Sequence, residues 1–121
     1  MQKPIPTKVH GVLDYMTAAF LHTLPRVLGW SDNVTRVLDV AAGGATGYSL
    51  FTDYELGLVR RLGMPAHLGL DAVLGALLAS SPWLFGFADR VAWPHVGFGI
   101  LAIAAALVTR TVADDRRSPV G

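Results

Sequence analysis

The stretch His10-Gly11-Val12-Leu13-Asp14 decides the fold, because it recurs as His67-Leu68-Gly69-Leu70-Asp71. Each copy opens a long apolar segment, and each segment closes on the same pattern of Pro, three residues, Gly and an aromatic residue. That pattern is Pro25 to Trp30 in the first copy and Pro82 to Phe87 in the second. A recurring apolar segment of this kind indicates one supersecondary unit used twice. We therefore expect two tandem copies of one helical unit.

Four apolar stretches follow from this repeat, and each is near the length needed to cross a hydrocarbon core of about 30 Å. They cover about residues 9–30, 34–51, 65–87 and 91–111. Short turns join the members of each pair, which makes neighbouring helices antiparallel. The sequence thus predicts an all-α fold, a bundle of four transmembrane helices made of two tandem helix hairpins. We expect a single integral membrane domain over residues 1–121, with repeat 1 at about 9–51 and repeat 2 at about 65–111.

The composition favours a membrane bundle over a soluble one. Of the 121 residues, 52% are hydrophobic and 16% are charged, against about 25% charged in soluble proteins. A soluble bundle helix needs a charged outer face, yet residues 96–109 contain no charged side chain. We therefore expect the lipid bilayer to be a partner of this chain.

Charge and residue types also exclude several functions. The net charge of +1 provides no basic face, so we expect no nucleic acid as a partner. The absence of cysteine excludes disulfides, thiolate metal sites and a cysteine nucleophile. Because no phosphate loop, nucleophile elbow or metalloprotease motif occurs, we favour a protein that is not an enzyme and predict no catalytic residue.

Lys and Arg predict the orientation, since cytoplasmic ends carry the excess of positive charge. The residues outside the first and fourth segments and between the second and third segments share one side. That side holds Lys3, Lys8, Arg60, Arg61, Arg110, Arg116 and Arg117, whereas the other holds Arg26, Arg36 and Arg90. We expect both termini in the cytoplasm and a disordered polar tail over residues 114–121.

The two His/Asp pairs are the main candidates for chemistry. His10 and Asp14 are four residues apart and share one helix face, as do His67 and Asp71. Because the two hairpins run in the same direction, the pairs lie at equal depth and can face each other across a pseudo-twofold axis. Ionisable residues inside a membrane span are functional candidates. Three roles stay open: pinning of the helix ends, relay of protons or ions, and a haem or metal site.

A cofactor is not predicted. His10 and His67 lie at one depth and are candidate axial ligands of haem, which keeps a haem- or quinone-linked redox protein as an alternative. Two His and two Asp also make a four-ligand metal set. Spacing alone does not bring the four side chains within bonding distance, so whether they bind a metal stays open.

Three further polar residues lie inside the expected helices. We expect Asp39 to point into the bundle, towards His95, Arg36 or a polar backbone group. His22 is expected to form a hydrogen bond inside the bundle. His95 lies near the end of the fourth helix, and neither histidine has a counterpart in the other repeat.

Small residues and an interfacial motif complete the candidates. Gly43-x-x-x-Gly47, with Gly97 and Gly99, allows helix backbones to approach closely in lipid. We expect this packing within the chain, with association between protomers as the alternative. In the motif Ser81-Pro82-Trp83, a serine can satisfy the carbonyl that the proline leaves unpaired. Trp83 belongs at the interface, and the glycine at position 86 can end the helix with positive φ.

The tripeptide Ser81-Pro82-Trp83, at the end of a helix that begins with an Asp, resembles the SPW-repeat family of small bacterial integral membrane proteins. The opening His10 to Tyr15 is similar to the start of these proteins, and the resemblance covers about residues 8–111. The first repeat departs from the motif, with Pro25-Arg26 in place of Pro-Trp. The family implies a multi-pass protein of the bacterial cytoplasmic (inner) membrane, and it supplies no catalytic residues.

Short loops and polar residues at helix ends favour a structural, accessory or assembly-related role, as a homo-oligomer or with a membrane-complex partner. One alternative is transport of protons, ions or small solutes through Asp14, Asp71 and Asp39, with His10 and His67 as titrating partners. The other alternative is the haem- or quinone-linked redox protein.

Overall fold

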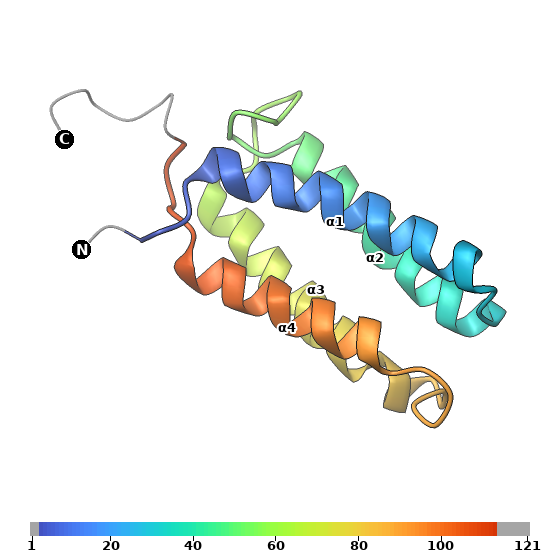
Figure 1. Cartoon of the computed structure of the whole chain (residues 1–121). Helices are drawn as coiled ribbons and strands as arrows, with labels where there is room; N and C mark the ends of the chain where they lie inside the picture. The colour runs from blue at the N-terminus through green and yellow to red at the C-terminus, as the bar shows by residue number, and fades with distance from the viewer. Residues whose placement is uncertain (1–2, 114–121) are drawn as a thin grey trace, which may run out of the picture.

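The computed structural model describes residues 3–113, and these residues form four helices arranged as two hairpins (Figure 1). The helices are α1 (Thr7–Leu28), α2 (Asp32–Leu50), α3 (Met64–Leu84) and α4 (Trp93–Val108). The predicted all-α fold is confirmed, since no strand occurs among the described residues. Each observed helix begins and ends within about three residues of its predicted bounds.

Glycine and proline define the ends of the first helix of each hairpin. Gly29 follows α1 with φ of 65°, and Gly86 follows α3 with φ of 73°. Glycine adopts this left-handed conformation without steric cost. Pro82 lies inside the last turn of α3 and leaves the carbonyl of Leu78 without its helical donor. The Ser81 hydroxyl donates to that carbonyl over 2.6 Å, as the sequence predicted.

A close backbone approach inside the second hairpin joins α3 to α4. A Cβ on Gly99 would lie 2.5 Å from the carbonyl oxygen of Gly75, and a Cβ on Gly75 would lie 2.6 Å from that of Gly99. At the equivalent positions of the first repeat stand Ala18 and Ala42, which are both buried. Each hairpin therefore closes on a pair of small residues at equivalent positions.

The other glycines expected to pack within the chain do not. A Cβ at Gly43, Gly47 or Gly97 would meet no atom within 4 Å in the described part of the chain. The prediction of intrachain packing is therefore wrong at these three positions. The physical reason is rotational, because these residues lie on helix faces turned away from the neighbouring helix, whereas Gly99 faces α3.

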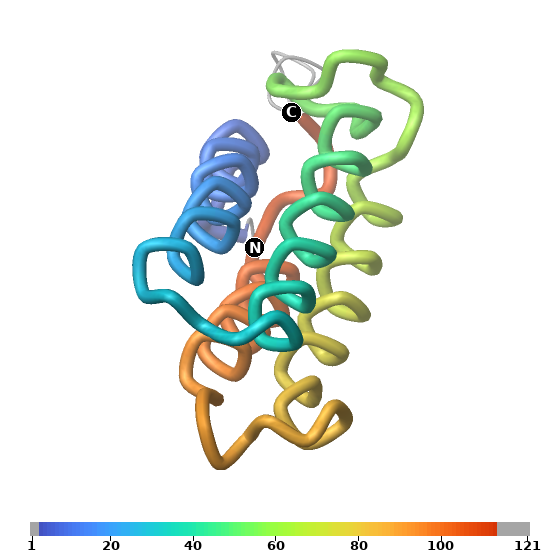
Figure 2. The backbone as a smooth tube through the Cα atoms, turned by 90° about the vertical axis from the view of Figure 1, so that its right-hand side faces the viewer, coloured from blue at the N-terminus to red at the C-terminus, as the bar shows by residue number. Residues whose placement is uncertain are grey.

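The two hairpins pack with α2 beside α3, which Figure 2 shows from the side. Their shared core consists of small and aliphatic side chains: Ala18, Leu21, Leu38, Ala41, Ala42 and Leu78. A second core lies at the end where α1 begins, and it contains Tyr54, Met64, Leu68, Ala106 and Ala113. The hairpins thus form one bundle with a separate packed layer at one end.

The connection between α2 and α3, residues 51–63, forms that layer by folding back over the start of α1. Tyr54 at its centre is fully buried. The hydroxyl of Tyr15 donates to the carbonyl of Leu56 over 2.9 Å, and the Thr7 hydroxyl donates to the Glu55 carboxylate over 2.7 Å. These contacts hold the connection against α1.

The first and last described segments lie side by side. Ile5 and Thr109 form a parallel bridge, in which the Ile5 N–H donates to Val108 over 3.2 Å and the Arg110 N–H donates to Ile5 over 2.9 Å. The described chain therefore enters and leaves the bundle at the same end. The predicted polar tail, residues 114–121, lies outside the described residues.

By length and hydropathy, α3 is the helix of the described chain that is long and apolar enough to cross a membrane, and α4 is apolar but shorter. Helices α1 and α2 carry more charged residues, among them Asp14 and Asp39. Whether α1 and α2 are compatible with a lipid environment depends on the positions and partners of these charged side chains.

Candidate metal centre

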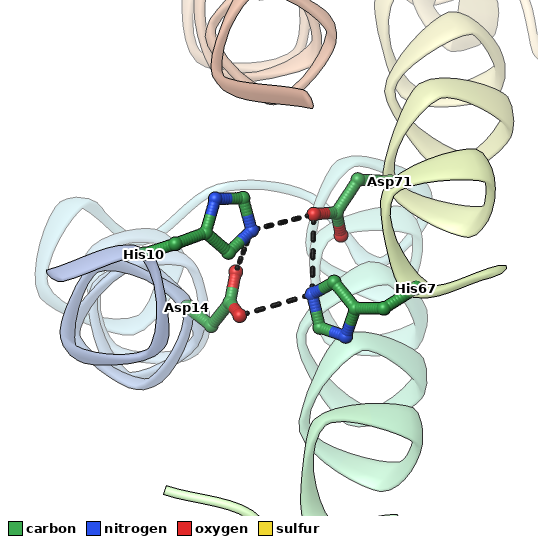
Figure 3. A group of neighbouring side chains, drawn as sticks. All are labelled: His10, Asp14, His67 and Asp71. Carbon is green, nitrogen blue, oxygen red and sulfur yellow. Dashed lines mark hydrogen bonds and ion pairs between the residues drawn. The ribbon is translucent and has the colours of Figure 1, made fainter. Parts of the chain in front are cut away.

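His10, Asp14, His67 and Asp71, called the quartet below, converge on one point (Figure 3). The first two side chains come from α1 and the last two from α3. One ligand atom from each residue lies within 4.8 Å of all the others. The two pairs that the repeat placed at equal depth are therefore brought together as a single site.

Each histidine lies closer to the aspartate of the other repeat than to its own. His10 Nε2 is 2.8 Å from an oxygen of Asp71 and 3.2 Å from one of Asp14. His67 Nε2 is 3.0 Å from Asp14 and 3.2 Å from Asp71. The quartet is thus an approximately twofold-symmetric cross-link between the hairpins, with both Nε2 atoms directed at the carboxylates.

Two threonines orient the histidine rings. His10 Nδ1 lies 2.8 Å from the Thr109 hydroxyl, which donates its own proton to Ala105 O. His67 Nδ1 lies 2.7 Å from the Thr52 hydroxyl, which donates to Tyr48 O. Because each hydroxyl proton is directed to a helix carbonyl, each threonine oxygen accepts from an Nδ1–H. The Nε2 atom of each ring is left to face the carboxylates.

Two tyrosines orient the carboxylates in turn. The Tyr54 hydroxyl donates to Asp14 over 2.8 Å, and the Tyr48 hydroxyl donates to Asp71. Burial, and then the nearby charge of Asp14, raise the pKa of Tyr54 well above its usual range. Tyr54 therefore keeps its proton and serves Asp14 as a permanent hydrogen-bond donor.

The interior of the quartet lacks a complete set of hydrogen bonds. His10 and His67 are 2% and 0% exposed, and His67 Nε2 has no hydrogen bond of good geometry despite its two carboxylate neighbours. A neutral imidazole with its proton on Nδ1 directs a lone pair from Nε2. At His67 such a lone pair faces two carboxylates and is repelled unless positive charge lies between them.

In protein metal sites, nitrogen and carboxylate ligands face inward, and a hydrogen bond from a neighbouring group holds each ligand in place. The quartet has this pattern. Neighbouring nitrogen and oxygen atoms here are 2.8 to 3.2 Å apart, and one ligand atom from each residue lies within 4.8 Å of the other three, which is a group small enough to surround one ion. The residues present therefore fit a four-coordinate divalent ion.

Asp39 lies elsewhere, and its predicted inward orientation is wrong. Arg26 donates to both oxygens of Asp39 over 2.8 Å, and His22 Nδ1 lies 2.9 Å from the same carboxylate. The His22 side chain is 59% exposed, so its expected place inside the bundle is also wrong. The antiparallel crossing of α1 and α2 puts Arg26 beside Asp39 on the outer face, where a bidentate ion pair forms.

His95 is buried as a separate group. Its Nε2 lies 3.3 Å from the carbonyl of Val34, and its ring packs against Phe87 with centroids 4.8 Å apart. The expected approach of Asp39 does not occur, because Asp39 is paired with Arg26. His95 therefore joins α4 to the start of α2 and takes no part in the quartet.

Sequence reasoning missed the four residues that surround the quartet. Thr52 and Thr109 have the same offset between the repeats as His10 and His67, so the repeat itself carried a signal for them. Tyr48 and Tyr54 align with Ala105 and Thr111 and carried no such signal. The tyrosines make the site asymmetric around a symmetric centre.

Comparison with known proteins adds one match. A family model described as the SPW repeat domain matches residues 8–109. No curated protein and no solved structure matches the chain. The match spans all four helices and all four residues of the quartet.

Proposed function

Because the chain belongs to the SPW repeat family and exposes apolar side chains on all its helices, we propose that it is a four-span membrane protein whose interior binds a divalent metal ion. The observation that carries the metal proposal is the quartet, in which two buried histidines and two carboxylates converge within 4.8 Å and His67 Nε2 has no hydrogen bond among the described residues. Both parts of the proposal can be tested separately.

The outer surface supports the membrane part. Large apolar side chains are exposed on each helix, among them Met16 (65%), Val40 (67%), Leu77 (57%) and Leu107 (69%). Soluble monomers rarely expose apolar patches of more than a few hundred Å². A bilayer would cover these side chains along the whole bundle.

The charged residues of α1 and α2 are compatible with spans. Asp14 lies in the quartet, and Asp39 forms a bidentate pair with Arg26, which lies in the last turn of α1. Paired charges and long side chains near a helix end cost far less in lipid than isolated ones. The distribution of Lys and Arg supports an orientation with both ends of the bundle chain on the cytoplasmic side of a bacterial inner membrane.

Charge balance supports a divalent ion. Two carboxylates buried in a medium of low dielectric constant require compensating charge. One divalent ion would neutralise both and would use the Nε2 lone pairs as ligands. Nitrogen and oxygen donors without sulfur suit borderline ions such as Zn²⁺ or Fe²⁺, so we expect binding across that series.

The quartet suits a single ion better than haem. The His10 and His67 rings have centroids 5.3 Å apart and are inclined by 79°. A porphyrin bound by both histidines would have to pass between the rings, where Asp14 and Asp71 contact both Nε2 atoms. We therefore propose a metal ion in place of the haem alternative.

An ion in the quartet would join the two hairpins, because each hairpin supplies one His and one Asp. This agrees with a structural or accessory role in the membrane, in which metal binding stabilises the bundle. Transport finds less support, since the bundle interior beyond the quartet is lined mainly by apolar side chains. Polar ions or solutes would have no hydrated route there.

Metal analysis of the detergent-purified full chain tests the proposal. We expect about one divalent ion per chain in the unaltered protein and a higher melting temperature after addition of Zn²⁺, because an ion that binds the folded state stabilises it. His10→Gln and His67→Gln should lose both the ion and the thermal shift.

His22→Gln is the matched control, since His22 lies outside the quartet and is exposed. Its metal content and thermal shift should equal those of the unaltered protein. Equal metal content in His10→Gln and His22→Gln, with both variants folded by circular dichroism, would refute the metal site. Recovery of the chain in the soluble fraction would refute the membrane part alone.

A further inference from the structure

A cavity of about 120 Å³ lies between the two hairpins and reaches the quartet. All four helices contribute to its wall. It exists because small side chains face one another where larger ones would fill a bundle core. Four of these are Ala42, Ala45, Gly75 and Ala102.

The cavity has two chemically different parts. Most of its wall is aliphatic or aromatic, as at Leu74, Leu78 and Phe98. At the quartet end the wall consists of His10, Asp14, Asp71 and Tyr48. A mainly apolar pocket with a few convergent polar groups is the usual form of a small-molecule site.

The size limits the occupant. A buried apolar cavity of about 150 Å³ accommodates a benzene molecule, so a volume of about 120 Å³ suits a body of about one ring. The cavity is partly open to the surface of the bundle, so a long acyl chain or a fused ring system would extend out of it.

The polar end selects the head group. Each carboxylate has more lone pairs than the hydrogen bonds that it accepts in this structure. The carboxylates can therefore accept a further hydrogen bond, so the head group of the bound molecule must be a donor. With a divalent ion bound, the two carboxylates are balanced, so a charged head would be buried without a partner. A hydroxyl satisfies both conditions, because it donates one hydrogen bond and carries no charge.

We propose that this cavity binds a neutral, ring-sized molecule with one hydroxyl group directed at the quartet. The choice of a neutral head rests on the proposed metal site, whereas the cavity and its acceptor groups do not depend on it. Such a molecule dissolves in lipid and would reach the cavity from the membrane.

Phenol and benzene are the probes, used on the metal-loaded full chain in detergent micelles. Saturation-transfer NMR measures the binding of each probe. We expect phenol to bind about tenfold more tightly than benzene, as one hydrogen bond to a charged acceptor allows. Ala102→Leu should abolish phenol binding, because the added side chain fills the cavity.

Ala104→Leu is the matched control on the same helix, since Ala104 is exposed and does not line the cavity. It should bind phenol within about twofold of the unaltered protein, at the precision expected of a change outside the site. Both variants sit in similar micelles, so partition of phenol into detergent cancels in the comparison. Ala45→Leu, on the facing helix, fills the cavity if Ala102→Leu does not fold.

The proposal is overturned if Ala102→Leu, Ala45→Leu and Ala104→Leu bind phenol equally, or if phenol and benzene bind with equal affinity. Repeating the titration on metal-stripped protein separates the two proposals. Phenol binding that persists in a protein that never binds metal supports the cavity and refutes only the metal site. Metal binding without any phenol binding refutes the cavity proposal alone.

Discussion

Each histidine of the quartet is oriented by a threonine that lies outside its own repeat, and this orientation bears directly on the proposed metal site. Thr109 accepts from His10 and Thr52 accepts from His67. Without these acceptors, each imidazole is free to move its proton to Nε2 and to rotate. The threonines therefore keep both Nε2 atoms directed at the position of the proposed metal ion.

Thr52→Val and Thr109→Val should each weaken metal binding by about 10- to 100-fold, which is the usual effect of losing the outer partner of a metal ligand. A buried Nδ1–H without an acceptor should also lower the free energy of unfolding by about 1–3 kcal/mol. Competition with a metallochromic chelator measures the affinity. Thr35→Val is the control, because its hydroxyl bonds Trp30 O far from the quartet; an equal loss there would contradict the assignment.

At the scale of elements, the connection 51–63 covers the quartet at the end of the bundle where the described chain enters and leaves. Its contacts depend on Gly57, where a Cβ would lie 1.9 Å from the carbonyl oxygen of Thr52. Any side chain at position 57 must therefore displace this segment, which also carries Tyr54 and its hydrogen bond to Asp14.

Gly57→Ala should accelerate the removal of bound metal by a chelator, because the displaced connection no longer covers the site. Stopped-flow chelation follows the rate. Gly63→Ala is the matched change in the same connection, since its Cβ would meet only Pro65, at 3.7 Å. Equal rates for the two variants would show that the connection does not control access.

Of the two glycines Gly97 and Gly99 in α4, only Gly99 contributes to the packing of α4 against α3. Gly99→Ala places a methyl group 2.5 Å from Gly75 O and 2.8 Å from the Ala79 Cβ, and such overpacking costs about 1–3 kcal/mol. Gly97→Ala meets no atom within 4 Å and gains up to about 1 kcal/mol from helix propensity. In detergent, the melting temperature should fall for Gly99→Ala and rise for Gly97→Ala. Equal shifts in the two variants would contradict the observed rotation of α4.

For the whole molecule, the paired ends at Ile5 and Thr109 require an even number of passes through the bundle. The chain contains no cysteine, so every introduced cysteine is a unique label. Asn33→Cys and Asp89→Cys should react with an impermeant maleimide on intact cells. Lys3→Cys and Leu58→Cys should react only after permeabilisation. Labelling of all four positions in intact cells would contradict the four-span arrangement.

The sequence by itself determined the helices, the hairpins and the equivalence of His10 with His67. These follow from local properties: apolar segment length, turn residues and an internal repeat, all of which can be read along the chain. Even the serine that satisfies Leu78 O beside Pro82 is a local effect. The membership of the SPW repeat family likewise follows from residues that lie in order along the chain.

Only the tertiary structure decided which side chains meet. The rotation of each helix about its axis depends on the sum of many packing contacts, and no short pattern encodes it. That rotation turned Asp39 outward to Arg26, left Gly43 and Gly47 facing away from the bundle, and brought Tyr54 from a connection onto Asp14. The quartet itself required two hairpins to pack in one register, because its ligands come from helices far apart in the chain.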